Sequence, residues 1–286
     1  MNQRADLHVH TTASDGQCTP EEVVEMARAL GLRAIAITDH ETTLGNSPAR
    51  RAARGTGLFV IPGVEISTES ALGEVHILGY FVQPQGNGLE HKLRAMRQAR
   101  LARARKMVDR LARLGMPIAW ERVREIAAGE SVGRPHVARA MLERGYVSSI
   151  DEAFDLYIGS GGPAYVPRRH VSPAEAIAMI MEARGVAVLA HPLRVAGIVP
   201  ELAKLGLQGL ETSYPGYSPD EVAYLSAIAR QHGLVETGGS DFHGPEVISV
   251  ELGAATAPFE AVTALMDRRP AAQPQRQARA GRAGAA

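Results

Sequence analysis

The sequence has one cysteine, no net charge and no long apolar run, and each of these absences excludes a class of protein. Cys18 is the single cysteine among 286 residues, which excludes an internal disulfide framework and a thiolate-rich zinc or iron–sulfur site. No run of about 18 apolar residues occurs and the first residues lack an apolar signal core, so we expect neither membrane spanning nor export. The expected location is the cytoplasm.

Charge excludes a second class. Lys and Arg together number 31, as do Asp and Glu, so no whole-chain field favours nucleic acid or a membrane surface, and any basic surface must be local.

Several well-known catalytic loops are also missing. There is no Walker loop, HExxH or GxSxG motif. The stretch "GSGGPA" from Gly159 fits a loose dinucleotide pattern, but it follows a helical segment and is interrupted by Pro163, which favours a simple turn. Ser240 in "GGSDFH" is better interpreted as positioning Asp241 than as a nucleophile.

Short apolar runs alternate with helical patterns over much of the chain. The runs lie at residues 5–9, 33–38, 58–66, 75–81, 185–192, 207–213 and 234–243. Between the first two, Thr19 and Glu22 form a capping box, Pro20 takes the first helical position and Gly31 suits the C-terminal cap, which together predict a helix. Seven strands joined by helices indicate an α/β fold of parallel units that fits a barrel better than an open sheet.

The alternation stops between residues 89 and 165, where only helices are predicted. We therefore divide the chain into a first barrel part (1–88), a helical insert (89–165), a second barrel part (166–268) and a tail (269–286) that we expect to be disordered. The first helix of the insert is rich in arginine. A solvated face is the favoured interpretation, and a basic wall facing a polyanion is the alternative. Among its basic residues are Arg94, Arg97, Arg100, Arg103, Arg105, Lys106, Arg110 and Arg113.

Histidines and carboxylates gather where the apolar runs end. They are His8 and His10 after the first run, His40 after the second, Glu65 at the end of the third, His191 in the fifth, and Asp241 with His243 in the last. The C-terminal strand ends of an α/β barrel open on one face, so these residues should converge there.

Local spacing supports a shared metal site. Residues two apart on a strand point to the same side, so the imidazoles of His8 and His10 can reach one metal while Val9 faces the packed layer. His76 lies early in its run, but a hairpin with the Glu65 segment could bring it to the same mouth. A lone histidine at a strand end is more often a satisfied polar residue, yet the joint pattern predicts metal binding.

At these residues the sequence resembles the PHP family, named for polymerase and histidinol phosphatase domains. The matching motifs are "DLHVHTTASDG", "AITDH", "PGVEIS", "EVHILGY", "LAHP" and "GGSDFHG". The resemblance implies a distorted seven-stranded (βα) barrel with a small helical insert and a trinuclear metal centre. It assigns one metal to His8, His10, Glu65 and Asp241, a second to the bridging Glu65 with His76 and His191, and a third to Asp15, His40 and His243.

The insert resembles the TrpH-type branch of this family. That branch removes phosphate from 3′,5′-bisphosphonucleotides such as 3′,5′-bisphosphoadenosine, and some members trim short RNA from its 5′ end. By this resemblance Arg134 and His136 reach over the metals toward phosphate, and Arg194 assists them. The expected partner is a phosphorylated nucleotide or short RNA, with neither a membrane nor a protein partner.

The chemistry of these residues suits phosphate esters. Three divalent ions carry six positive charges and the ligands Asp15, Glu65 and Asp241 return three, a surplus that matches a phosphate ester. Mixed imidazole and carboxylate ligands favour manganese, with iron and zinc as alternatives. A hydroxide bridging the metals is the expected nucleophile, with His191 and Asp241 as catalytic ligands. His136 or a metal-bound water would protonate the leaving group.

Three residues around the site carry open interpretations. Asp39 either orients the imidazole of His40 or caps the following helix. Glu211 either faces the mouth or, slightly favoured, pairs with an arginine. Cys18 is interpreted as a small packing residue.

Three other functions compete with a nucleotide phosphatase as an interpretation of the sequence. A barrel amidohydrolase shares the first HxH, but it would not need Asp15, His40 and the Asp241–His243 pair together. A catalytically silent PHP module should have lost ligands. Histidinol phosphate phosphatase is the alternative within the family, against which the long insert counts.

Overall fold

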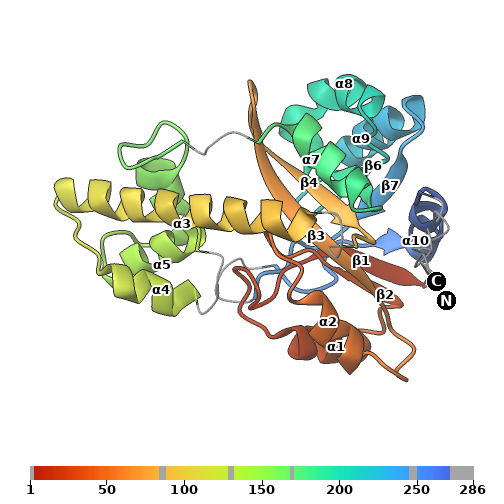
Figure 1. Cartoon of the computed structure of the whole chain (residues 1–286), viewed down its shortest axis with the longest axis horizontal. Coiled ribbons are helices and arrows are strands. Elements are labelled where there is room, and N and C mark those ends of the chain that lie inside the picture. Colours follow the sequence, from red (N-terminus) through yellow and green to blue (C-terminus); the bar gives the residue numbers. More distant parts are fainter. Residues whose placement is uncertain (1–2, 84–87, 128–131, 168–170, 245–249, 271–286) are drawn as a thin grey trace, which may run out of the picture.

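The computed structural model describes residues 3–83, 88–127, 132–167, 171–244 and 250–270 as an α/β barrel with a helical module at one side (Figure 1). The strands are β1 (Arg4–Val9), β2 (Ala34–Ile37), β3 (Phe59–Ser70), β4 (Gly73–Tyr80), β5 (Val186–Leu189), β6 (Gly209–Ser213), β7 (Val235–Gly238) and β8 (Ala257–Pro258). They form one sheet in the order β7-β6-β5-β4-β3-β2-β1-β8. Val9 and Phe242 form a further parallel bridge, which brings the β7 side of the sheet back to β1 and nearly closes the barrel.

The barrel departs from regular parallel order at β4, which runs antiparallel to both β3 and β5. Only Ala71 and Leu72 separate β3 from β4, and so short a connection permits a hairpin but no parallel crossover. The hairpin predicted for His76 is thus confirmed, while its strand is not one of the expected parallel units. The two-residue strand β8 was not predicted, because it has no apolar run of its own.

Helices cover the outside of the sheet. The barrel helices are α1 (Pro20–Ala29), α2 (Asn46–Ala52), α7 (Pro173–Glu182), the 3₁₀ segment η2 (Pro192–Ile198), α8 (Val199–Lys204), α9 (Pro219–Gln231) and α10 (Phe259–Asp267). The capping box of Thr19 and Glu22 is present at the start of α1, as predicted. Val9 is buried in a cluster with Val23, Val24 and Ala27 of α1, so it faces the packed layer as expected.

The helical module comprises the segments between β4 and α7. They are α3 (Leu89–Arg113), α4 (Trp120–Ala127), α5 (Arg134–Glu143), α6 (Ile150–Ala153) and the π-helical turn η1 (Phe154–Ile158). Apolar side chains from these segments, among them Leu111, Val123 and Met141, form a cluster of their own. Figure 1 shows α4 and α5 beside the barrel, with α3 running from the barrel out to them. A separate small core therefore holds this module together.

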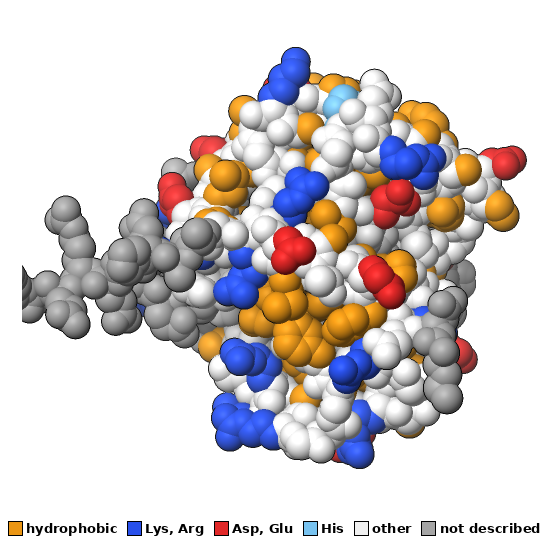
Figure 2. Space-filling model, turned by 90° about the vertical axis from the view of Figure 1, so that its right-hand side faces the viewer, with side chains coloured by type: hydrophobic (Ala, Val, Ile, Leu, Met, Phe, Trp, Pro, Cys, Tyr) orange, Lys and Arg blue, Asp and Glu red, His pale blue; other side chains and the backbone are white. Residues whose placement is uncertain are grey.

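The other end of the molecule carries no part of the helical module. Viewed from that side in Figure 2, apolar side chains gather at the centre of the face, and charged side chains of both signs surround them. None of the described helices is both long and apolar enough to cross a membrane. Residues 271–286, which contain most of the predicted disordered tail, lie outside the described residues.

Candidate metal centre

The carboxylate of Glu65 lies at the centre of the candidate site and faces five imidazoles. Its Oε2 lies 3.3 Å from His8 Nε2, 3.1 Å from His10 Nε2 and 3.2 Å from His40 Nδ1. Its Oε1 lies 2.8 Å from His76 Nδ1 and 3.6 Å from His191 Nε2. Glu65 is buried on β3, and the imidazoles come from the ends of β1, β2 and β5 and from the hairpin strand β4. Both oxygens of one carboxylate are thus shared among ligand-type nitrogens.

Asp241 completes one group of donors. Its Oδ1 lies 3.2 Å from His8 Nε2 and 3.1 Å from His10 Nε2. These three residues and Glu65 place one ligand atom each within 4.8 Å of one another. The close approach of the loop after β7 to β1 depends on Gly239, where a Cβ atom would lie only 2.4 Å from the Cβ of His8.

Asp15 gathers a second group on the other side of His10. Its Oδ1 lies 3.5 Å from His243 Nε2 and 3.7 Å from His10 Nδ1, and its Oδ2 lies 3.8 Å from His40 Nε2. This group again fits within 4.8 Å. It contains the predicted set of Asp15, His40 and His243, with His10 added.

A third group consists of His40, Glu65 and His76. The resemblance had assigned His191 here instead of His40. In the structure His191 lies at the edge of the group through its distance to Glu65 Oε1, and its side chain is 28% exposed. All nine predicted ligands therefore converge, but His10 and His40 each stand between two groups.

Buried polar atoms without hydrogen bonds test whether cations fit this cluster. Among the described residues, no hydrogen-bond partner is present for the buried atoms His8 Nε2, His10 Nδ1, His10 Nε2, Asp15 Oδ1, Glu65 Oε1 and His76 Nε2. Burial without such partners is costly. Imidazole nitrogen and carboxylate oxygen are ordinary ligands of divalent transition metals. The cluster can therefore hold metal ions, which would satisfy these atoms.

Electrostatic coupling within the cluster is strong. Burial alone would lower the pKa of His10 and of His76, but nearby carboxylates outweigh it and raise the two values to about 10 and about 9. Burial opposes ionisation of Glu65 and Asp241, yet the neighbouring imidazoles hold both carboxyl pKa values well below their usual range. The site accordingly favours positive charge between the carboxylates, whether as protons or as metal ions.

Two buried acids contact the candidate ligands or their neighbours from behind. Glu211 Oε1 lies 3.0 Å from His8 Nδ1, and Glu211 Oε2 accepts a hydrogen bond from the backbone N–H of His191 at 2.7 Å. Glu211 therefore faces the mouth of the barrel. The slightly favoured prediction, a salt bridge between Glu211 and an arginine, is wrong. Asp6 accepts hydrogen bonds from the backbone N–H and the hydroxyl of Ser240 at 2.9 and 2.5 Å. This contact supports the interpretation of Ser240 as a positioning residue for Asp241.

Asp39 has neither of its predicted roles. Its carboxylate accepts hydrogen bonds from Thr11 and Ser14 at 2.7 to 2.9 Å. The next helix, α2, is preceded by Gly45 and has no side-chain cap. Asp39 instead fixes the loop that carries Asp15.

Cys18 is half-buried and packs against the cluster of α1, in line with the packing interpretation.

The basic helix corrects a further expectation. Arg97, Arg100 and Arg103 are buried at spacings of three along α3, so the solvated-face interpretation is wrong for these residues. Arg100 donates to Asp15 Oδ2 at 2.9 Å and to Glu41 Oε2 at 2.7 Å. The helical period turns one arginine stripe toward the barrel, where Arg100 pairs with two buried acids. Sequence reasoning missed this link between the insert and Asp15.

Tyr214 was also missed. Its hydroxyl donates to Asp241 Oδ2 at 2.9 Å, and its ring lies 5.5 Å from that of His191. It follows β6, the strand with no predicted ligand, and its proximity to a strand end was the one available signal.

The backbone of the candidate site is strained at three residues. Glu41, His191 and Asp241 adopt positive φ values of 50°, 31° and 52°, which non-glycine residues rarely do outside functional sites.

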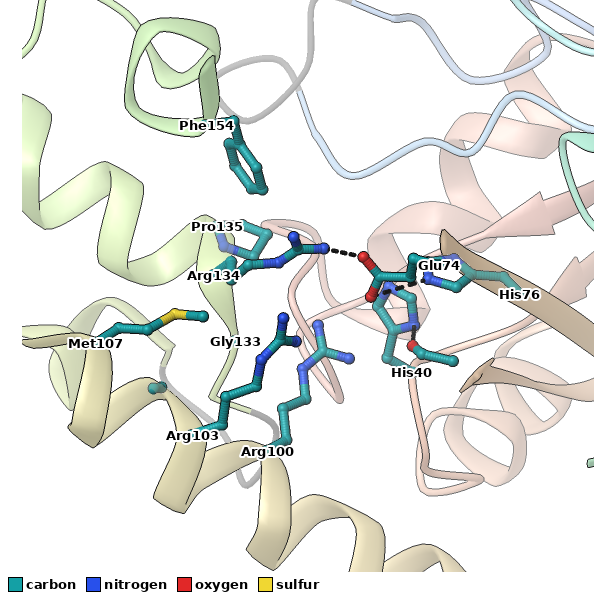
Figure 3. Close-up of a pocket in the computed structure, with 12 residues that line it drawn as sticks. His40, Glu74, His76, Arg100, Arg103, Met107, Gly133, Arg134, Pro135 and Phe154 are labelled. Carbon is teal, nitrogen blue, oxygen red and sulfur yellow. Dashed lines mark hydrogen bonds and ion pairs between the residues drawn. The ribbon is translucent and has the colours of Figure 1, made fainter. Parts of the chain in front are cut away.

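A pocket of about 130 Å³ lies between the metal-ligand cluster and the helical module (Figure 3). Arg134 from α5 points across it and pairs with Glu74, which also lies 3.5 Å from His76 Nε2. Arg100 and Arg103 enter from α3, and Phe154 borders the pocket on the module side. The pocket thus combines cationic side chains with an aromatic ring beside the candidate metal ligands.

The other two predicted phosphate-binding residues lie elsewhere. His136 is buried at the start of α5, where its Nδ1 accepts a hydrogen bond from the backbone N–H of Gly133 at 2.9 Å. It lines a neighbouring hollow together with Asp15. Burial, aided by the positive charge of Arg100, lowers its pKa to about 4. Arg194 is exposed on η2 and is not among the residues that line the Arg134 pocket.

Comparison with known proteins agrees with this geometry. The PHP domain model matches residues 6–162. The 5′-3′ exoribonuclease Rnm of Escherichia coli K12 is 38% identical, covering 84% of this chain and 85% of that protein. The 3′,5′-nucleoside bisphosphate phosphatase of Chromobacterium violaceum is 34% identical, covering 84% and 87%. A solved structure from Bifidobacterium adolescentis, assigned as a metal-dependent phosphoesterase, superposes with a TM-score of 0.86 at 33% identity, covering 93% and 96%.

The distorted barrel and its ligand cluster, together with these relatives, define a metal-dependent hydrolase of phosphate esters. The chain belongs to the PHP family, whose model spans more than half of it.

Proposed function

We propose that this phosphoesterase removes a phosphate from 3′,5′-bisphosphonucleotides and also trims short RNA from its 5′ end. The observation that carries the proposal is the position of the Arg134 pocket directly beside the Glu65 cluster. A phosphate bound to Arg134 in this pocket would lie against the candidate metal ligands. The names of two relatives, an exoribonuclease and a bisphosphate phosphatase, support a nucleotide as the substrate.

We assign three divalent ions, with manganese favoured, to the nine converging side chains. One ion would be held by His8, His10, Glu65 and Asp241, and a second by Glu65, His76 and His191. The third would be held by Asp15, His40 and His243. The distances to Glu65 and Asp15 support this division, and His10 and His40 are close enough to serve either neighbour. When bound, such ions act as Lewis acids on phosphate oxygens and make water a nucleophile at neutral pH.

The chain itself supplies binding and orientation. Arg134 pairs with Glu74 in the structure, so an incoming phosphate must replace this carboxylate at the guanidinium. Arginine suits the exchange because its planar fork binds two phosphate oxygens as readily as a carboxylate. Arg100 and Arg103 line the same pocket, and Arg100 is already paired there with Asp15 and Glu41. Glu211 and Tyr214 hold His8 and Asp241 in place through their hydrogen bonds.

Proton delivery to the leaving group is assigned to solvent in preference to His136. The Nδ1 of His136 accepts a backbone hydrogen bond, which places the proton of the neutral ring on Nε2. Its pKa of about 4 keeps the ring neutral at pH 7. A neutral imidazole in this position is a hydrogen-bond donor to substrate and a poor general acid. Arg194, which is exposed, has a secondary role at most in this proposal.

The test compares three substrates on manganese-loaded protein. We expect kcat/KM to be highest for 3′,5′-bisphosphoadenosine, measurable for a 5′-phosphorylated RNA oligonucleotide and lowest for histidinol phosphate. Asp241→Asn, which removes a ligand charge, serves as the inactive control. If histidinol phosphate is the best of the three substrates, the nucleotide assignment is wrong.

A further inference from the structure

A second hollow lies where the helical module meets the barrel loop that carries Leu44, and it takes no part in the site described above. It is a groove of about 690 Å³ between α3 and α4. Its lining comprises Leu44, Glu90, Arg94, Arg97, Gln98, Leu101, Arg105, Trp120, Arg124 and Val132. We call it the α3–α4 groove. In Figure 1 both helices lie beside the barrel, with α4 below α3.

The α3–α4 groove concentrates positive charge that the chain as a whole does not have. Its lining holds four arginines and one glutamate, a surplus of three positive charges, whereas the whole chain has a net charge of zero. The glutamate, Glu90, is already paired with Arg97 at 2.8 Å. Arg94, Arg105 and Arg124 are exposed and have no carboxylate partner among the described residues. Three guanidinium groups are therefore available for an anionic ligand.

An aromatic ring lies among these charges. Trp120 is half-buried at the start of α4 and lines the groove. The guanidinium of Arg105 lies 5.8 Å from the centre of its ring. Exposed apolar side chains of Leu44 and Leu101 border the same groove. Cationic side chains that follow a backbone, interleaved with a stacking platform, are the combination that binds single-stranded nucleic acid.

The groove adjoins the metal-ligand cluster. Arg97 lines the groove and donates to the backbone carbonyl of Glu41 at 2.7 Å, and Glu41 directly follows the ligand candidate His40. Val132 lines the groove, whereas the next residue, Gly133, lines the Arg134 pocket. The Arg134 pocket and the α3–α4 groove are therefore neighbours, since consecutive residues of one segment line them.

We propose that the α3–α4 groove binds the RNA chain on the 3′ side of the nucleotide being released, with phosphates on Arg94, Arg105 and Arg124 and a base on Trp120. This inference rests on the proposed function, because it presumes a nucleotide in the Arg134 pocket. It adds a site that a mononucleotide does not reach. The groove would thus serve RNA alone, while the metal centre serves both substrates.

The test separates the two substrates. Wild-type protein, Arg94→Ala/Arg105→Ala and Trp120→Ala are assayed with a 5′-phosphorylated RNA of five nucleotides and with 3′,5′-bisphosphoadenosine. We expect kcat/KM for RNA to fall at least about tenfold in the double variant, because two phosphate contacts are lost. In Trp120→Ala we expect a fall of at least about fivefold, as is usual for loss of a stacked base. Turnover of the bisphosphate should stay within about twofold of wild type.

Arg113→Ala is the control, because it removes one arginine from the same helix at an exposed position outside the groove lining. It should leave both substrates unchanged. Because Trp120 also packs against the module core, the double arginine variant decides the matter if Trp120→Ala is unstable. An unchanged rate on RNA, an equal loss on both substrates, or a wild type that cleaves the bisphosphate but not RNA overturns the groove assignment. A wild type that cleaves neither nucleotide substrate overturns the proposed function itself.

Discussion

One carboxylate, that of Glu211, holds both His8 and His191 in position. Its Oε1 lies 3.0 Å from His8 Nδ1, and its Oε2 accepts the backbone N–H of His191 at 2.7 Å. The contact to Nδ1 leaves His8 Nε2 directed at Glu65 and Asp241. A carboxylate that accepts the other ring N–H of a metal-binding imidazole typically fixes both the tautomer and the orientation of the ring.

Replacement of this acid should weaken the site without removing a ligand. We expect Glu211→Gln to reduce metal affinity about 10- to 100-fold. The amide has one acceptor oxygen and no negative charge, so it cannot accept the hydrogen bonds of both His8 and His191. Competition with a fluorescent chelator measures the change. Glu236→Gln, at a glutamate on β7 that contacts Ser226 and Arg230 instead of the ligands, is the control. Equal affinities for the two variants would show that Glu211 does not position ligands.

Asp15 and His8 should affect different ions. Asp15 belongs to the group with His40 and His243, whereas His8 belongs to the group with Glu65 and Asp241. We expect Asp15→Asn to lose about one of three bound metals while the others remain, and His8→Ala to lose the ion next to Asp241. Metal content by mass spectrometry, together with the anomalous density of each site, measures this. Loss of all metals in Asp15→Asn would contradict the division.

Arg100 should matter more to the metal-free protein than to the loaded one. It is buried between Asp15 and Glu41, so Arg100→Ala removes a buried cation that both carboxylates contact, a loss of about 3–5 kcal/mol. Bound metal would neutralise Asp15 in its place and reduce the loss. Thermal unfolding with and without Mn²⁺ measures the difference. Arg113→Ala should be neutral in both conditions, and an Arg100→Ala protein as stable as wild type would refute the buried link.

Metal binding should release protons, and its affinity should rise with pH. In the metal-free protein the pKa values of His10 and His76 are raised to about 10 and about 9, so both rings are protonated at pH 7. A metal ligand must be neutral imidazole, so each ring gives up a proton on loading, and this cost disappears as pH approaches 9 to 10. Calorimetry in two buffers of different ionisation enthalpy measures proton release. A binding heat that does not depend on the buffer would contradict the prediction.

Arg134 should act on substrate binding more than on the chemical step. We expect Arg134→Ala to raise KM about tenfold, in line with loss of a charge-assisted hydrogen bond of about 1.5–3 kcal/mol, with a smaller change in kcat. Steady-state kinetics on 3′,5′-bisphosphoadenosine measures both constants. If both stay at wild-type values, the insert makes no contact with phosphate.

The ligand cluster could be predicted because it depends on a regular rule. Strand ends in a barrel open on one face, so residues as distant as His8, His191 and Asp241 could be brought together from sequence. The capping box at Thr19 is local and could be predicted for the same reason. The roles of Asp39 and Glu211 could not be, because a carboxylate at a strand end has several partners within reach and only the packed structure selects one.

The prediction from sequence and the structure differ most in what the helical insert contributes to the site. Arg100 is sixty residues from His40 in sequence, and its ion pairs depend on how α3 docks against the barrel. No periodicity within α3 indicates which of its arginine stripes faces inward, since all of them are basic. The antiparallel β4 has a similar origin, because the two-residue turn before it determines its direction and its apolar pattern does not.

The most direct test of the metal-dependent mechanism is phosphate release from 3′,5′-bisphosphoadenosine by chelator-treated protein titrated with Mn²⁺. The arrangement of nine candidate ligands, with Glu65 and Asp15 among them, predicts no turnover without metal, and a rise in activity that ends near three equivalents per chain. Full activity in the stripped protein, or no phosphate release at any metal concentration, would contradict it.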